Sequence, residues 1–151
     1  CKLEFLGVLE TEEAIRDFCV SLDLKEKLGL AVLLEEGNLL LVEQSLDGWK
    51  SKPQPLDWNV DFGVLRAETE KIKWKEEGRL LGTDRHGLTT LYAVVRSDLE
   101  LAEKEGIEES RVEDEFSMAE MGISDWVLWK NVLVAGTEEG SLRLRRVFGE
   151  D

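Results

Sequence analysis

Few residues in this chain have the types and spacing that catalysis or metal binding needs. His86 is the only histidine, and Cys1 and Cys19 lie far from it in the sequence, so these residues cannot build a typical zinc site. The glycine-rich phosphate loops, the nucleophile elbow and the metalloprotease motif are all absent. Cys1 could act as a freed nucleophile, but no partner base accompanies it. We therefore expect no catalytic residue, no metal ligand and no cofactor, and an enzyme ranks behind two kinds of binding protein.

The charge and the apolar runs narrow the possible partners. The 151 residues include 33 acidic and 19 basic ones, a formal net charge of −14. Duplex DNA is bound largely through Lys and Arg contacts to phosphate, so we expect no direct duplex DNA binding. The longest apolar run, residues 28–34, is too short for a membrane span, which needs about 20 residues. Two cysteines, no signal peptide and no glycosylation acceptor favour an intracellular location, cytoplasmic or nuclear.

Half of the net negative charge lies in one segment, residues 98–115, which has nine acidic and two basic residues. The simpler interpretation is a solvated helical or disordered insertion, opened by a capping box at Ser97 and Glu100. The alternative is an acidic docking segment for a basic partner. The candidate protein-binding residues in this segment are Glu108, Glu109, Asp114 and Glu115.

Tryptophan supplies the other candidate binding residues. Trp49 follows Asp-Gly in a loop and precedes Lys50, so this pair is a candidate exposed anchor for a protein partner. Trp58, Trp74 and Trp129 lie on alternating strands, and we expect them in the core.

The elements that carry these residues are mainly strands. Apolar and polar residues alternate from 56 to 64, which indicates a strand with one buried face. Three pairs of apolar runs surround polar turns that contain Gly37, Gly87 and Gly140, and we expect these glycines to have positive φ. Between residues 11 and 24 a helix and a strand both fit, and we favour a turn to about Arg16 followed by a strand.

The three turn glycines recur about every 50 residues, which indicates an internal repeat. The stretch from Trp74 to Gly82-Thr83 is similar to the stretch from Trp129 to Gly136-Thr137. The repeat divides a single β-rich domain into units of about 17–66, 70–116 and 123–148. Each unit holds about four strands, although the fourth strand of the second unit, near 112–116, is weakly patterned.

Four strands per unit with a turn glycine in the middle resembles a divergent WD40-like β-propeller that lacks the Gly-His and Trp-Asp dipeptides. The resemblance implies binding through loops and blade edges. Three blades do not close a ring of the usual 4–8, so we expect this chain to be part of a larger propeller, and the initial Cys fits that idea. The alternative fold is a β-sandwich or small barrel with one helical insertion.

These observations favour a non-enzymatic protein–protein interaction scaffold, a WD-repeat subunit of a larger complex. Its partners would be other protein subunits or the remainder of its own chain. The alternative is a small acidic inhibitor or immunity-type protein whose carboxylates bind a basic surface.

Overall fold

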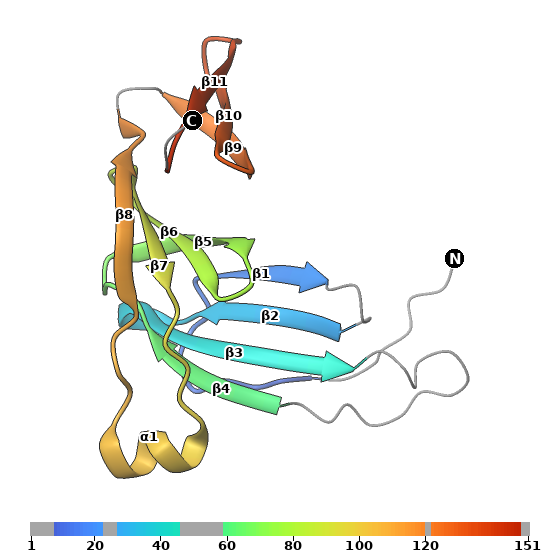
Figure 1. The fold of residues 1–151 in the computed structure, drawn as a ribbon, viewed down its shortest axis with the longest axis vertical. Coiled ribbons are helices and arrows are strands. Elements are labelled where there is room, and N and C mark those ends of the chain that lie inside the picture. The colour runs from blue at the N-terminus through green and yellow to red at the C-terminus, as the bar shows by residue number, and fades with distance from the viewer. Residues whose placement is uncertain (1–7, 23–26, 46–58, 120–121, 149–151) are drawn as a thin grey trace, which may run out of the picture.

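The alternating segments form three antiparallel sheets, described by a computed structural model for residues 8–22, 27–45, 59–119 and 122–148 (Figure 1). Eleven strands and one α-helix lie in these residues. The three sheets follow one another along the long axis of the molecule, in chain order. The expectation of a mostly β protein is confirmed. The described strands form three separate sheets, and none of these closes into a barrel.

The first sheet is a meander of four strands in chain order. The strands are β1 (Asp17–Leu22), β2 (Lys27–Leu33), β3 (Asn38–Ser45) and β4 (Asn59–Val64). The strand expected after Arg16 is therefore confirmed as β1. A short 3₁₀ turn (Glu35–Gly37) joins β2 to β3, and Gly37 has φ of 79°. The backbone carbonyl of Leu65 lies where a side chain at position 37 would be, so only glycine fits there.

The second sheet repeats this order with four more strands. They are β5 (Thr69–Glu76), β6 (Arg79–Asp84), β7 (Leu88–Ala93) and β8 (Arg111–Ser117). The turn between β6 and β7 contains Gly87, which has φ of 85°. Asp84 closes this turn, because its Oδ1 accepts hydrogen bonds from the backbone N–H groups of His86 (2.8 Å) and Leu88 (3.0 Å). His86 thus belongs to a polar turn that is closed by Asp84.

The third sheet has three strands in the described residues: β9 (Ile123–Trp129), β10 (Val132–Thr137) and β11 (Leu142–Arg146). β10 is central and pairs with both neighbours. Gly140, between β10 and β11, has φ of 93°. All three turn glycines therefore have the positive φ that the sequence predicts.

The main core lies between the first two sheets. Its fully buried members come from β2, β3, β5, β6 and β7 and from the connection after β4: Ala31, Leu33, Leu39, Leu41, Leu65, Ile72, Leu80 and Tyr92. Cys19 and Trp74 pack against this cluster, so the edge strands β1 and β5 also contribute to it. A smaller cluster attaches the third sheet, with Leu133 at its centre and Met118, at the end of β8, beside it.

The acidic segment differs in part from the expectation. The helix α1 (Leu99–Glu105) exists and is exposed, but its N-cap is Asp98 rather than Ser97. The Asp98 carboxylate accepts a hydrogen bond of 2.7 Å from the N–H of Leu101. The interpretation of the whole of 98–115 as an insertion is wrong, since its last residues form β8. The alternation in that stretch is hidden by acidic residues on an exposed edge strand, where charge is tolerated.

Candidate functional site

Glu108 and Glu109 lie in the connection between α1 and β8, and both are exposed. This connection is held to the first sheet, because Glu109 forms an isolated parallel bridge with Val64 of β4. The N–H of Ser110 donates to the carbonyl of Val64 at 2.9 Å. The buried Ser110 hydroxyl in turn accepts from the N–H of Val95 at 3.2 Å. The backbone here joins two sheets, while the carboxylates point to a surface.

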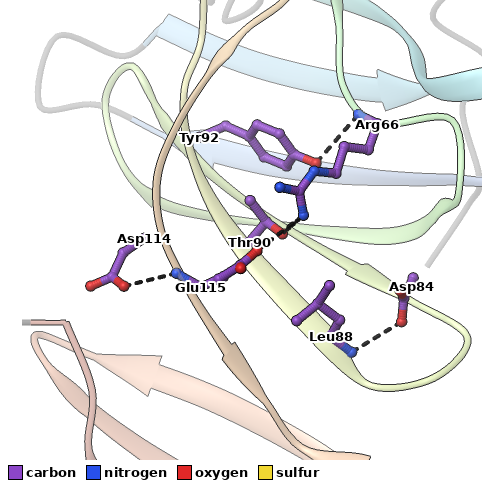
Figure 2. A network of polar contacts seen from close by, with 7 residues as sticks. All are labelled: Arg66, Asp84, Leu88, Thr90, Tyr92, Asp114 and Glu115. Carbon is purple, nitrogen blue, oxygen red and sulfur yellow. Dashed lines mark hydrogen bonds and ion pairs between the residues drawn. The ribbon is translucent and has the colours of Figure 1, made fainter.

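Asp114 and Glu115 lie on β8 and take part in a network that ties the sheets together (Figure 2). The guanidinium of Arg66 donates hydrogen bonds to the carboxylate of Glu115 at 3.1 Å and to the hydroxyl of Thr90 at 3.3 Å. The backbone N–H of Arg66 donates to the phenol oxygen of Tyr92 at 3.3 Å. Asp114 accepts from the N–H of Glu115 at 2.8 Å. The pair of Arg66 and Glu115 therefore links β8 to the connection between the first and second sheets.

The tryptophans are distributed differently from the expectation. Trp49 and Lys50 lie outside the described residues, as does Trp58. Trp74 is half-buried against the main core, as its place on an alternating strand suggests. Trp129 is 64% exposed, so the prediction that it belongs to the core is wrong. The Nζ of Lys130 lies 4.7 Å from the centre of its ring.

Trp129 belongs to an exposed apolar face of the third sheet, which we call the third-sheet face. The strand pairing places its members on the same side: Val127 and Trp129 of β9, Val132 and Val134 of β10, and Leu142 and Leu144 of β11. The exposed fractions are 56% for Val127, 74% for Leu142 and 69% for Leu144. The opposite face of the same sheet carries Leu133 and Ala135, both fully buried. The sheet is thus apolar on both faces but covered on one.

A signal for this face exists in the sequence. Residues 126–129 read Trp-Val-Leu-Trp, an apolar run with no polar alternation. Such a run is typical of a strand covered on both faces. The exposure of Leu142 and Leu144 has no such signal, because the alternation Leu-Arg-Leu-Arg predicts that the leucines point inward. The structure places them outward, because the pairing with β10 puts Leu144 on the side of Val134 and leaves Arg143 and Arg145 on the inner side.

The far face of the first sheet, turned away from the second sheet, is also apolar. The pairing aligns Phe18 with Val32, Leu40 and Phe62, and aligns Val20 with Leu30, Val42 and Val60. We call these eight side chains the first-sheet face. Val32 and Val42 are buried, whereas Phe18 and Val20 on β1 are 61% and 52% exposed. The accessible part of this face therefore follows β1.

A cavity of about 660 Å³ lies among the three sheets and is lined by their first strands. Lys73 of β5 reaches across to β9, where its Nζ lies 4.3 Å from the ring centre of Trp126 and 3.6 Å from the carboxylate of Asp125. The Nζ also donates to the backbone carbonyl of Trp126. The pKa of Asp125 is lowered, first by a hydrogen bond from the N–H of Trp126 and then by the charge of Lys73. These groups hold the third sheet in place.

Cys19 also lines this cavity, but its chemistry is unsuited to nucleophilic attack. Burial, together with the nearby charge of Asp17, raises the pKa of the Cys19 thiol to about 12. The reactive thiolate is therefore scarce at neutral pH. Within the described residues, no group of three or more His, Cys, Asp and Glu side chains could hold a metal ion. No helix among them is long and apolar enough to cross a membrane.

Comparisons with known proteins add little to this geometry. No protein-family model matches the chain, and no curated protein matches it. The structure is similar to the crystal structure of a computationally designed protein, Ika4, with a TM-score of 0.40 and 9% sequence identity. The similarity covers 98% of this chain and 100% of the designed one.

Proposed function

We propose that this protein is a non-enzymatic interaction module: part of a WD40-like propeller that acts as a scaffold within a larger assembly. The observation that carries the proposal is the third-sheet face. Six apolar side chains lie together there, and four of them are exposed: Val127, Trp129, Leu142 and Leu144. Large exposed apolar patches are rare on monomeric proteins and mark interaction sites.

The arrangement of the sheets supports the propeller part of the proposal. Each sheet is a meander in chain order, so its first strand is an edge. The first strands are neighbours: the N–H of Ile72 on β5 donates to Asp17 on β1 at 2.8 Å, and Lys73 on β5 contacts Trp126 on β9. In a propeller, blades are arranged around a central channel. The cavity lined by β1, β5 and β9 has the corresponding position.

The acidic alternative receives less support. It requires carboxylates that are available to a basic partner. On β8, Glu113 pairs with Arg79 at 3.1 Å and Glu115 pairs with Arg66 at 3.1 Å. These two carboxylates are therefore paired with basic residues of this chain, which leaves Glu108 and Glu109 as the exposed candidates for a basic partner.

The proposal can be tested on the intact chain by light scattering and a urea melt. We expect the unmodified chain to be oligomeric, insoluble or loosely folded, because an uncovered blade face forfeits several kcal/mol at about 25 cal/mol per Å². The double variant Leu142→Lys, Leu144→Lys should associate less than the unmodified chain. The matched control is Leu99→Lys on α1, where an exposed leucine lies outside the third-sheet face. A monodisperse unmodified monomer with one cooperative transition would contradict the proposal.

A further inference from the structure

The stack of three sheets ends in two apolar faces that point away from the second sheet. One is the third-sheet face, and the other is the first-sheet face. Each contains an exposed aromatic ring beside an exposed valine: Trp129 and Val127 on the third-sheet face, and Phe18 and Val20 on the first-sheet face. The other members of the first-sheet face are buried or half-buried, so its exposed part is on β1. Aromatic residues are enriched at the centres of protein interfaces. The two faces thus have the same chemistry, and neither can reach the other within one chain, because the second sheet separates them (Figure 1).

The two ends also have complementary charge. Lys130 lies beside Trp129, and Arg146 shares the side of β11 that carries Leu142 and Leu144, whereas Arg143 and Arg145 lie on the opposite side. Residues 123–148 contain four basic and three acidic residues, in a chain that is otherwise strongly acidic. Residues 8–22, 27–45 and 59–64, which carry the first sheet, contain eight acidic and two basic residues. The two ends therefore carry opposite net charge, which favours an encounter between them.

Resting on the proposed function, we propose that the partner is a second copy of this chain. The third-sheet face of each copy covers the first-sheet face of the other, and a two-fold axis relates the two contacts. Two copies bring together six sheets, which lies within the 4–8 blades of closed propellers. One copy gives three sheets and three copies give nine, and both numbers fall outside that range. Closure around a two-fold axis leaves neither end face exposed.

The pairing makes a specific prediction for two variants, one on each face. Leu144→Asp damages the third-sheet face and Val20→Lys damages the first-sheet face. A dimer of either variant contains two damaged contacts, so we expect each variant alone to dimerise at least about tenfold more weakly. A mixed dimer contains one contact in which both faces are intact. Mixing the two variants should therefore restore a species of twice 17.2 kDa, measured by sedimentation or native mass spectrometry.

The control and a second variant keep the test decisive. Leu99→Asp makes the same change as Leu144→Asp at a leucine that is 57% exposed on α1, away from both faces, and it should dimerise as the unmodified chain does. If Val20→Lys fails to fold, Phe18→Lys tests the same face. Recovery on mixing also shows that both variants are folded, since a misfolded chain could not complete an intact contact.

The possible outcomes separate this inference from the proposed function. Dimers that are restored by mixing support both. If Val20→Lys dimerises normally while Leu144→Asp does not, the third-sheet face binds its own copy, and the pairing with the first-sheet face is overturned. Indefinite oligomers would overturn the closed dimer and leave the scaffold function standing. An unmodified monomer with a single cooperative unfolding transition would overturn both.

Discussion

The first two sheets bury more apolar side chains against each other than the third sheet buries against its neighbour. Between the first two sheets lies a core of eight buried residues that includes Leu33 and Tyr92, and the strands on both sides contribute to it. The third sheet is attached by a cluster with three buried members, of which Leu133 is fully buried. Its other face presents Trp129 and Leu144 to the surface. The sheets that pack against each other on a shared face thus bury more apolar surface than the third sheet does.

The difference lies in how many faces of each sheet are covered. A β-sheet that is apolar on both faces needs a covering layer on each side. The first and second sheets cover each other, and the second and third sheets share the contact between Lys73 and Trp126. The outer faces of the first and third sheets have no such covering sheet among the described residues.

The largest expected effect contrasts the two cores. Leu33→Ala removes a fully buried side chain from the main core and should cost about 2–5 kcal/mol of unfolding free energy. Leu133→Ala is chemically matched, since Leu133 is also fully buried, but it acts within the smaller cluster. We expect Leu33→Ala to shift the midpoint of the whole urea transition. Leu133→Ala should mainly raise amide exchange in β9–β11. Equal effects of both variants on all three sheets would show that the sheets form one cooperative unit.

A second contrast uses two turn glycines. Gly140→Ala should cost about 1–2 kcal/mol, because φ of 93° strains an L-residue and no atom lies within 4 Å of the added Cβ. Gly37→Ala carries the same kind of strain and also places Cβ 2.3 Å from the carbonyl oxygen of Leu65. That overlap should add about 1–3 kcal/mol. Urea melts of the two variants measure the difference, and a smaller loss for Gly37→Ala would contradict the packing described between β2, β3 and residue 65.

The pKa of Cys19 gives a probe of the contact between β1 and β5. The thiol has a pKa of about 12 in the folded chain, against 9.0 as the ordinary value. The folded state therefore holds the proton more tightly, and this contribution to stability is complete below about pH 9 and is lost as the pH rises toward 12. Across that window, stability should fall more steeply for the unmodified chain than for Cys19→Ala. Parallel curves from denaturant melts at each pH would show that burial does not raise the pKa.

The smallest expected effect concerns α1. Its residues include no buried side chain, and its ion pair between Glu100 and Lys104 (3.0 Å) is exposed. Replacing Leu99–Glu105 with a Gly-Ser linker of equal length should change the unfolding free energy by less than about 1 kcal/mol. Ser110 must be retained, because it is buried and bonded to Val64. A collapse of folding would show that the helix has a structural task.

Much of the local structure could be predicted from the sequence. Apolar alternation and glycine turns locate the strands, because a strand with a covered face needs period-2 patterning and a tight turn needs positive φ. The sequence of β8 shows little apolar alternation, and two of its glutamates, Glu113 and Glu115, form ion pairs with Arg79 and Arg66. Those pairings join distant segments and leave no local signal.

The exposed face could be predicted less well. An apolar residue in the sequence indicates burial in some complete assembly, but it does not tell whether the covering layer belongs to the same chain. Trp129 therefore has the pattern of a core residue and the position of a surface residue. The same pattern gives Trp74 a place against the main core, because a neighbouring sheet is present there. Trp74 and Trp129 are therefore distinguished by the arrangement of the sheets and not by their local sequence.

The central claim, that the third-sheet face is a docking surface, is tested most directly by amide hydrogen exchange. The unmodified chain is compared at equal concentration with the double variant Leu142→Lys, Leu144→Lys. We predict faster exchange in the variant at β9–β11 and also at β1, which belongs to the sheet at the opposite end of the stack, while β6 in the middle sheet stays unchanged. Identical exchange at β1 and β11 in the two proteins would contradict the claim, because an uncovered face has no protection to lose.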